Sequence, residues 1–316
     1  MAKRGVMICN IGTPNSSEVE DVAKYLVEFL SDGEVISIPN PIRHFLVRWW
    51  IVPRRKAFSA GNYKRIWTPE GSPLMVFTKR LKNALQAALG ESAQVEIGMR
   101  YADPSIETAM KNFKAAGIEE ITILPVYPQY ARATTVSTFM KIDEVNLKHN
   151  FNFKIKKVDR FYDQPEFIAA FAETAQNFLK GKKADHYLMT YHGLPASQNR
   201  KMKPPEVAYR DQCLRTSELI AEKMGLQKSD YTTSFQSRLG PAKWIQPYTD
   251  GVLKELAQSG IKNLAVLCPS FVSDCLETID EIGVEGKHIF EEAGGEKFHL
   301  VPCLNERVDY LVSFLQ

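Results

Sequence analysis

Short apolar runs alternate along this chain with longer stretches in which apolar residues recur every three or four positions. The short runs are typical of buried strands and the longer stretches of amphipathic helices. In the first half of the chain they predict strands at 6–10, 95–99, 121–125 and 153–158, and helices at 19–30 and 106–116. Strands that alternate with helices indicate βαβ units and a parallel sheet.

The same alternation restarts near residue 160. It predicts strands at 187–190, 231–235, 264–269 and 298–301, and helices at 165–180, 206–224, 249–259 and 305–314, with a further acidic helix that opens near Ser273. We therefore predict an α/β fold of two Rossmann-like, doubly wound parallel-sheet domains, 1–160 and 161–316, with a cleft between them. No Gly/Ser-rich or Pro-rich linker marks the boundary.

Composition and charge mainly exclude certain classes of protein. The chain has 316 residues, enough for two ordinary domains, and a formal net charge of +3, which is too small to indicate nucleic-acid binding. No apolar run approaches the roughly 20 residues of a spanning helix, and the N-terminal run is too short for a signal peptide. We expect a cytoplasmic protein.

Five cysteines are dispersed along the chain, and no two form a C-x-x-C pair: Cys9, Cys213, Cys268, Cys275 and Cys303. This spacing argues against a zinc ribbon, a thioredoxin-type redox motif and a local iron–sulfur motif. An odd number of scattered thiols is typical of reduced cysteines in a cytosol.

Ligands of open parallel α/β sheets bind at the carboxyl ends of the strands, so residues that follow predicted strands are candidate site residues. His192 follows the strand at 187–190 and precedes Gly193 and Pro195, which favour a tight turn. An imidazole placed there suits proton transfer. A single histidine is more often an ordinary surface or core residue, but the other five lack such a setting.

The acidic helix offers a second candidate. At 100° per residue, Asp274, Glu277 and Glu281 fall on one narrow face, where their like charges repel unless a cation or proton intervenes. The alternative is helix capping, because Asp274-x-x-Glu277 resembles a capping box. Spacing alone favours capping, although a capping acid can also face a cleft.

Three other post-strand segments could line the same cleft. Arg100-Tyr101 follows one strand, and the loop 125–135 contains aromatic residues that could stack on a planar ligand and Arg132, which could meet an anion. The loop 235–249 is polar and contains Trp244. Its alternative interpretation is an ordinary loop with Trp244 as a packing anchor.

The segment 42–65 combines basic and apolar residues without an acid. Its bases are Arg43, Arg48, Arg54, Arg55, Lys56, Lys64 and Arg65, and its apolar residues include Phe45, Leu46, Trp49, Trp50, Ile51, Val52 and Phe58. The mixture is typical of an interfacial element on an anionic membrane. A helix that docks its apolar face on its own domain is an equally good interpretation.

Taken in order, these segments make the chain resemble the ferrochelatase family, in its bacterial type. The matching motifs are Asn10-Ile11-Gly12-Thr13-Pro14, Gly71-Ser72-Pro73, Arg100-Tyr101, Tyr127-Pro128-Gln129-Tyr130 with Thr134-Thr135, His192-Gly193-Leu194-Pro195, Phe235-Gln236-Ser237-Arg238 with Gly240-Pro241 and Trp244, and Asp274 with Glu277-Thr278 and Glu281. They cover nearly the whole chain.

The resemblance implies a lyase that inserts Fe(II) into protoporphyrin IX and releases two protons during haem biosynthesis. It implies that His192 and Glu277 are catalytic and metal-binding, with Asp274 and Glu281 as further candidate metal ligands. The implied porphyrin-binding residues are Ile11, Ser72, Arg100, Tyr101, Tyr130, Ser237 and Trp244. The implied lip, which meets porphyrin and the cytoplasmic membrane face, contains Phe45, Leu46, Trp49 and Trp50.

The resemblance also implies the partners. Protoporphyrin IX and Fe(II) are substrates, the upstream porphyrinogen oxidase is a candidate protein partner, and no prosthetic group is expected. Cys275 stands where some members carry a second histidine, so a two-histidine site is not expected there. The chain lacks the cysteine-bearing C-terminal extension of animal members and has no internal cysteine cluster, so we expect no [2Fe–2S] cluster.

Two alternatives stay open. One is a chelatase for coproporphyrin III or another tetrapyrrole, such as sirohydrochlorin. The other, from a different class, is a non-catalytic protein that binds a small ligand in a two-domain cleft and has no particular use for His192 opposite an acidic helix.

Overall fold

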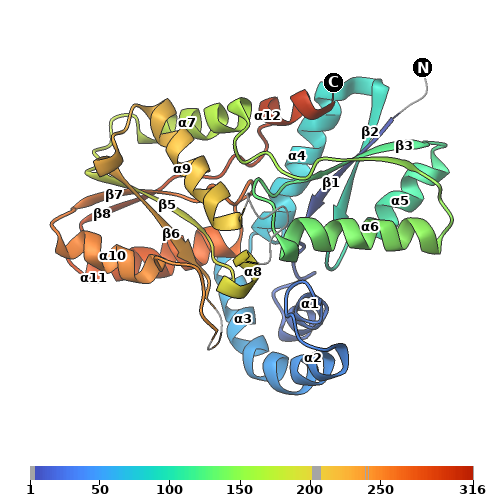
Figure 1. The fold of residues 1–316 in the computed structure, drawn as a ribbon, viewed down its shortest axis with the longest axis horizontal. Coiled ribbons are helices and arrows are strands. Elements are labelled where there is room, and N and C mark those ends of the chain that lie inside the picture. Colours follow the sequence, from blue (N-terminus) through green and yellow to red (C-terminus); the bar gives the residue numbers. More distant parts are fainter. Residues whose placement is uncertain (1–3, 201–207, 239, 241, 316) are drawn as a thin grey trace. The chain divides into compact units, whose positions relative to one another are not determined.

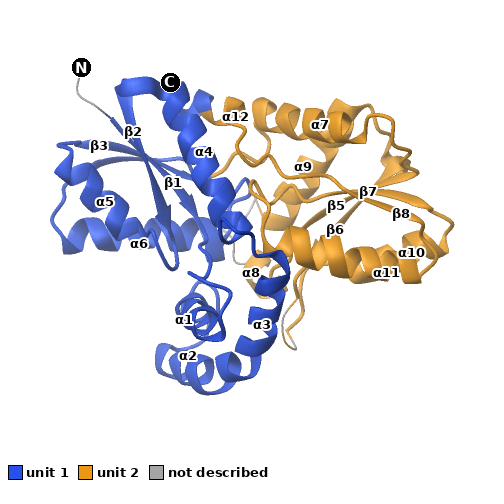
Figure 2. Cartoon of the chain, turned by 180° about the vertical axis from the view of Figure 1, so that it is seen from behind, with its two compact units in different colours: residues 1–159, 312–316 blue, residues 160–311 orange. Residues whose placement is uncertain are grey.

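The computed structural model describes residues 4–200, 208–238, 240 and 242–315. The chain divides into two compact units, which Figure 2 shows in different colours. The first unit contains residues 1–159 and 312–316, and the second contains residues 160–311. The C-terminal residues contact the first unit, where Lys156 Nζ donates to the carbonyl of Phe314 (2.9 Å).

The first unit is built on a sheet of four parallel strands in the order β2-β1-β3-β4. The strands are β1 (Arg4–Asn10), β2 (Ala93–Met99), β3 (Glu120–Pro125) and β4 (Lys154–Lys157). The central strand β1 is buried on both faces, as its continuous apolar run predicts. Helices α5 (Ile106–Ala115) and α6 (Ser137–Lys148) cover one face and pack against Met7 and Cys9.

The other helices of the first unit are α1 (Val19–Leu30), α2 (Asn40–Leu46), η1 (Val47–Ile51), α3 (Val52–Ile66), α4 (Pro73–Leu89), η2 (Gly90–Ser92) and η3 (Arg132–Val136). Helices α1, α2 and α3 form a group beyond the carboxyl ends of the strands (Figure 1). The amide of Ala102, just after β2, donates to Glu28 of α1 (3.0 Å).

The second unit repeats the same architecture with strands in the order β6-β5-β7-β8. These strands are β5 (His186–His192), β6 (Tyr231–Gln236), β7 (Asn263–Leu267) and β8 (Lys297–Leu300). The chain passes from β5 to β6 on one side of β5, and then crosses to β7 on the other side of β5. The topological switch point, where parallel α/β sheets bind ligands, therefore lies between β5 and β7.

The helices of the second unit are α7 (Pro165–Leu179), α8 (Ala196–Arg200), α9 (Tyr209–Met224), η5 (Lys228–Asp230), α10 (Thr249–Gln258), η6 (Glu277–Gly286), α11 (Lys287–Glu292) and α12 (Asp309–Val312), and η7 (Ser313–Leu315) follows in the first unit. Residues of α10, η6 and α11 form one apolar core with β5 and β7. Helices α7 and α9 pack against each other.

These two four-stranded parallel sheets confirm the predicted α/β fold class. All eight predicted strands are present, each within two residues of its predicted ends. Helices α4, α6 and α8 were not predicted, and residues 206–207 of one predicted helix lie outside the described residues. The predicted terminal helix at 305–314 is wrong in extent: α12 is shorter, because Asn305 has a φ of +51° and its amide donates to Val272.

No helix in the described part of the chain is long and apolar enough to cross a membrane.

Candidate functional site

His192 is the last residue of β5, at the switch point of the second sheet, where it pairs with Gln236 of β6. Both of its backbone groups are fixed from neighbouring elements. Its amide donates to the hydroxyl of Ser270, just after β7 (3.1 Å), and its carbonyl accepts from the hydroxyl of Tyr209 on α9 (2.9 Å). The main chain that carries the imidazole is therefore rigidly placed.

The imidazole of His192 has a defined tautomer. Its Nδ1 lies 2.7 Å from the carbonyl oxygen of Gly193, which can only accept, so Nδ1 carries the proton. The lone pair of Nε2 is then available to a proton or a metal. Gly193 is required here because a Cβ at this position would lie 2.7 Å from the carbonyl oxygen of Gln236.

The predicted acidic helix is a π-helix, η6, which begins at Glu277. Hydrogen bonds in a π-helix span five residues, so side chains four positions apart lie close to one face. Glu277, Glu281 and Glu285 have that spacing. Asp274 lies ahead of the helix, so the prediction that it shares a helical face with Glu277 and Glu281 is wrong. Glu285 was missed, although its four-residue spacing from Glu281 was visible in the sequence.

Gln236 ties this π-helix to the sheet. Its side-chain oxygen accepts from Thr190 on β5 (3.1 Å), and its side-chain nitrogen donates to the carbonyl of Glu277 (2.8 Å) and to Glu281 (3.3 Å). The side chain is almost fully buried, so water could not take its place as the hydrogen-bond partner of these groups. The positions of β5, β6 and η6 are thereby coupled through one amide.

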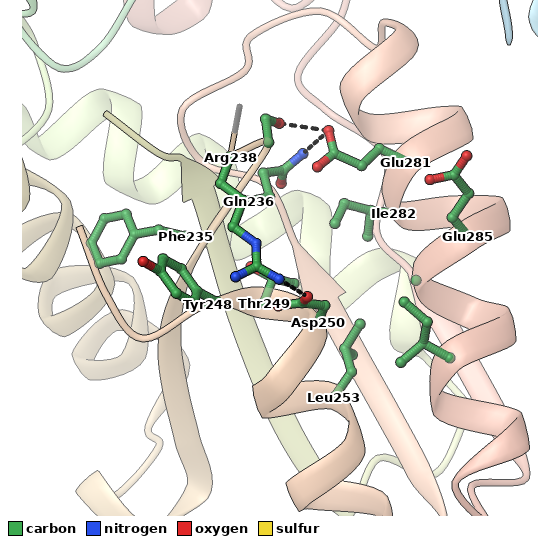
Figure 3. Close-up of a pocket in the computed structure, with 13 residues that line it drawn as sticks. Phe235, Gln236, Arg238, Tyr248, Thr249, Asp250, Leu253, Glu281, Ile282 and Glu285 are labelled. Atoms are coloured by element: carbon green, nitrogen blue, oxygen red, sulfur yellow. Dashed lines mark hydrogen bonds and ion pairs between the residues drawn. The ribbon is translucent and has the colours of Figure 1, made fainter. Parts of the chain in front are cut away.

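Glu281 lines a cavity of about 260 Å³ in the second unit. The Ser237 hydroxyl donates to its carboxylate at 2.5 Å, and Figure 3 shows that carboxylate beside Gln236. Burial raises the pKa of Glu281, and the nearby charge of Glu277 adds to that effect. The Ser237 hydrogen bond and the charge of His192 act in the opposite direction. His192, Glu277 and Glu281 thus interact electrostatically at one end of the sheet.

Asp274 has a different environment. It is buried, and its carboxylate accepts from the hydroxyl of Thr278 (3.0 Å), the side-chain amide of Asn305 (2.8 Å) and the backbone amide of Cys303 (3.3 Å). The amide of Asp274 donates to Asn305 rather than to Glu277, so the predicted capping box is not formed. Asp274 anchors the start of η6 to the segment that follows β8.

Arg100 and Tyr101 lie at the end of β2 in the first unit and converge on Asp32. Arg100 Nη2 is 2.5 Å and the Tyr101 hydroxyl 2.8 Å from the same carboxylate oxygen, and the Ser137 hydroxyl donates to it as well (2.5 Å). Burial alone would raise the pKa of Asp32, but these bonds, a bond from the amide of Glu34 and the Arg100 charge lower it. Tyr101 is only 1% exposed.

The other predicted porphyrin residues are distributed over both units. Ile11, half-buried, follows β1, and the buried Ser72 hydroxyl accepts from Thr13 (2.8 Å). Tyr130 is half-buried in the loop after β3. In the second unit Trp244 is half-buried and pairs through its backbone with Pro195, so it lies close to the turn after His192.

The predicted lip is formed by α2, η1 and α3, and part of it docks on its own unit, as one of the two interpretations predicted. Val47 and Val52 are buried against Leu30 of α1. On the other side, five large apolar side chains are 55–65% exposed: Ile42, Phe45, Trp49, Trp50 and Phe58. Leu46 is only half-exposed.

Not every base of the lip faces solvent. The guanidinium of Arg43 donates to the carbonyls of Ser31 and Ile38 (both 2.7 Å) and so holds the segment between α1 and α2. Outside the lip, Arg132 pairs with Glu34 (2.7 Å). Arg48 and Arg54 are exposed.

All five cysteines are free and buried. Burial raises the pKa of each thiol, which makes the reactive thiolate unfavourable. Among the described residues, no group of three or more His, Cys, Asp or Glu side chains is arranged to hold a metal ion.

The two-sheet α/β fold is similar to that of solved structures described as chelatases or as chelatase-like. Among solved structures, SirB from Bacillus subtilis with Fe3+ is similar with a TM-score of 0.55 and 13% identity over 99% of this chain and 93% of that chain. DR2241 from Deinococcus radiodurans, described as structurally similar to chelatases, has a TM-score of 0.52 at 11% identity, over 100% of this chain and 54% of that one. Identities this low show the fold alone.

Sequence comparison is more specific. The family model described as Ferrochelatase matches residues 3–315. Proteins named ferrochelatase from Bdellovibrio bacteriovorus and Ectopseudomonas mendocina are 42% and 41% identical, each over 99% of this chain and 98% and 96% of their own lengths. The chain belongs to the ferrochelatase family. This confirms the resemblance and the predicted enzyme class, a lyase that inserts a metal into a porphyrin.

The contacts of Asp274 predict a structural role that can be measured. Replacing Asp274 by Ala leaves the side-chain amide of Asn305 and the backbone amide of Cys303 without this acceptor and should lower the free energy of unfolding by about 2–4 kcal/mol. In a chain of this size that lowers the Tm by several degrees, measurable by differential scanning calorimetry. Exposed Glu255→Ala is the control. An unchanged Tm together with a raised KM for iron would instead make Asp274 a metal ligand.

The Asp32 cluster predicts a pH-dependent effect. The lowered pKa of Asp32 means that its contribution to stability is present above its unfolded pKa of about 3.9 and lost as the pH falls through its folded value. Asp32→Asn should therefore lower the free energy of unfolding by about 1–3 kcal/mol at pH 7. The difference from the unsubstituted protein should shrink below about pH 4.

Urea denaturation at pH 7 and below about pH 4 measures this effect. Asp143→Asn, which removes a charge from an exposed pair with Lys157, is the matched control. Equal losses for Asp32→Asn at the two pH values would contradict the assignment.

Proposed function

We propose that this chain inserts Fe(II) into protoporphyrin IX with release of two protons, and that His192 and Glu277 carry the reaction. The observation that best supports this is the Nε2 lone pair of His192, at a sheet switch point and within electrostatic range of the acids on η6. Iron is a substrate of this reaction. Because its insertion involves no electron transfer, the reaction requires no prosthetic group.

His192 is proposed to accept the pyrrole protons. An imidazole titrates near neutral pH, so it can take a proton from a pyrrole N–H and pass it on. Its Nδ1–H is held by Gly193, which leaves Nε2 as the accepting atom. The imidazolium that results is stabilised by the negative charge of Glu277 and Glu281.

Glu277 is proposed to meet the iron, with Glu281 behind it. An imidazole and a carboxylate together are an acceptable set of Fe(II) ligands, although they also suit Zn(II) and Co(II). Glu281 can hold either a proton or a cation, because burial makes its isolated negative charge unfavourable. Asp274 is proposed as an anchor of η6, since its oxygens already accept three hydrogen bonds.

The porphyrin-binding residues are proposed for each predicted domain by itself. The domain predicted at 1–160 supplies Ile11, Ser72, Arg100, Tyr101 and Tyr130, and the domain predicted at 161–316 supplies Ser237 and Trp244. Asp32 holds the guanidinium of Arg100 and the hydroxyl of Tyr101. Because Tyr101 and Ser72 are buried, these two are proposed to support the wall of the site from behind rather than to touch the porphyrin.

The lip is proposed to rest on an anionic membrane surface and to receive an apolar porphyrin there. Five exposed apolar side chains on α2, η1 and α3 stand beside exposed Arg48 and Arg54. Apolar side chains can enter the acyl boundary while cations meet lipid phosphates. Protoporphyrin, with two carboxylates, suits such a lip better than coproporphyrin, which has four.

His192→Ala tests the reaction. We expect kcat/KM for anaerobic Fe(II) insertion to fall by about 10²–10⁴-fold, the usual contribution of general base catalysis, while porphyrin binding and Tm are retained. Turnover is measured as the loss of porphyrin fluorescence. The matched control is His288→Ala, an exposed histidine of α11. Substantial turnover in His192→Ala would remove this residue from the mechanism.

The same assay with coproporphyrin III in parallel identifies the substrate. Faster turnover of protoporphyrin IX supports the proposal. Turnover of coproporphyrin alone would keep the chemistry and overturn the substrate assignment, and turnover of neither would favour a different tetrapyrrole or a binding protein.

The lip predicts membrane binding. Replacing Trp49 and Trp50 by Ser should lower partitioning into phosphatidylglycerol vesicles by at least about tenfold, because each buried indole contributes more than about 1 kcal/mol. Sedimentation of vesicles measures it. The control replaces Met140 and Leu147, exposed apolar residues of α6. Equal partitioning of the unsubstituted protein and both variants would contradict the membrane assignment.

A further inference from the structure

Arg238 has an unusual position beside the acids of η6. It is the only base among the described residues that line the cavity of Glu281. It also directly follows Ser237, whose hydroxyl contacts the Glu281 carboxylate, and consecutive Cα atoms are only about 3.8 Å apart. A long, permanently charged side chain therefore starts within reach of a carboxylate that the proposed function assigns to cation handling.

The guanidinium nevertheless does not lie at Glu281. Figure 3 shows Arg238 directed toward Asp250 at the start of α10 and away from Glu281. Its Nη2 is 2.8 Å from Asp250 Oδ2, and its Cζ lies 4.6 Å from the centre of the Tyr248 ring. The charges meeting Glu281 are those of His192 and Glu277, and its hydrogen bonds come from neutral Ser237 and Gln236.

The pairing of Arg238 with Asp250 instead of Glu281 affects whether a cation can bind at Glu281. An arginine paired with Glu281 would neutralise the carboxylate and repel a divalent ion from the cavity. The Arg238–Asp250 pair is about half-exposed, so it contributes little to stability. A difference of about 1 kcal/mol between two side-chain positions still changes their populations about fivefold.

We propose that Asp250 and Tyr248 hold Arg238 in a withdrawn position, which leaves Glu281 open to a divalent cation. Asp250 is thus a positioning residue for iron supply that acts through Arg238 and does not itself bind the metal. This inference rests on the proposed role of Glu281.

The test compares iron and porphyrin dependence of insertion in three variants. Asp250→Asn removes the charge but keeps an oxygen for the amide of Gly251, which Asp250 holds at the start of α10 (2.9 Å). We expect its KM for Fe(II) to rise about threefold to tenfold while the KM for protoporphyrin stays unchanged. The double variant Arg238→Gln/Asp250→Asn should return the KM for Fe(II) to the unsubstituted value.

Two controls separate a local effect from a change in overall charge. Glu255→Gln and Lys254→Ala each remove one exposed charge from α10 without touching the cavity. Both should leave the KM for Fe(II) unchanged.

The result of the double variant is decisive. A raised KM for Fe(II) that persists in Arg238→Gln/Asp250→Asn would make Asp250 a cation ligand in its own right and overturn the proposal. An unchanged KM for Fe(II) in Asp250→Asn would overturn it as well.

Glu281→Gln separates failure of this inference from failure of the proposed function. A raised KM for Fe(II) in Glu281→Gln beside an unchanged one in Asp250→Asn overturns only the inference. An unchanged KM in Glu281→Gln removes Glu281 from the proposed function and the inference with it.

Discussion

The hydrogen bonds of the Gln236 amide are the contact on which the candidate site depends. One buried side chain accepts from Thr190 on β5 and donates to the backbone of Glu277 and the carboxylate of Glu281 on η6. Because His192 ends the same strand as Thr190, the amide sets the imidazole and the acids relative to one another. Breaking these bonds would leave the buried amide of Gln236 without its partners and the Glu277 carbonyl without this donor, and that cost maintains the arrangement.

Acids with similar sequence settings differ in what surrounds them. Asp32 and Asp274 are each surrounded by several donors, which fix the carboxylate and connect distant segments. Glu281 has two neutral donors and a neighbouring acid, so burial raises its pKa. Carboxylates of the first kind stabilise the fold. A carboxylate of the second kind gains from binding a proton or cation, which is what metal insertion requires.

The two units share one architecture but use the corresponding strand end differently. Their strand orders correspond, and His192 at the end of β5 has its counterpart in Asn10 at the end of β1. Asn10 uses its side chain locally: its oxygen accepts from the amide of Ile11 (2.8 Å) and its nitrogen donates to Thr78 (3.1 Å). The same position therefore fixes a turn in one unit and presents an imidazole in the other. SirB has a similar fold at 13% identity, which agrees with a scaffold that tolerates different sequences.

The sequence by itself determined the strands, most helices and the place of His192, because apolar periodicity and a turn after a strand are local properties. The tertiary structure decided the rest. The π-helix at Glu277 is bonded by a residue 41 positions away, and Asp274 meets Asn305 at a separation of 31. Local spacing predicted a regular helix that opens near Ser273 with a capping box. The helix is present, but it begins at Glu277 in π form and the capping box is not formed. Which carboxylate becomes an anchor and which stays open depends on burial and on distant donors, and neither can be read from neighbours in the chain.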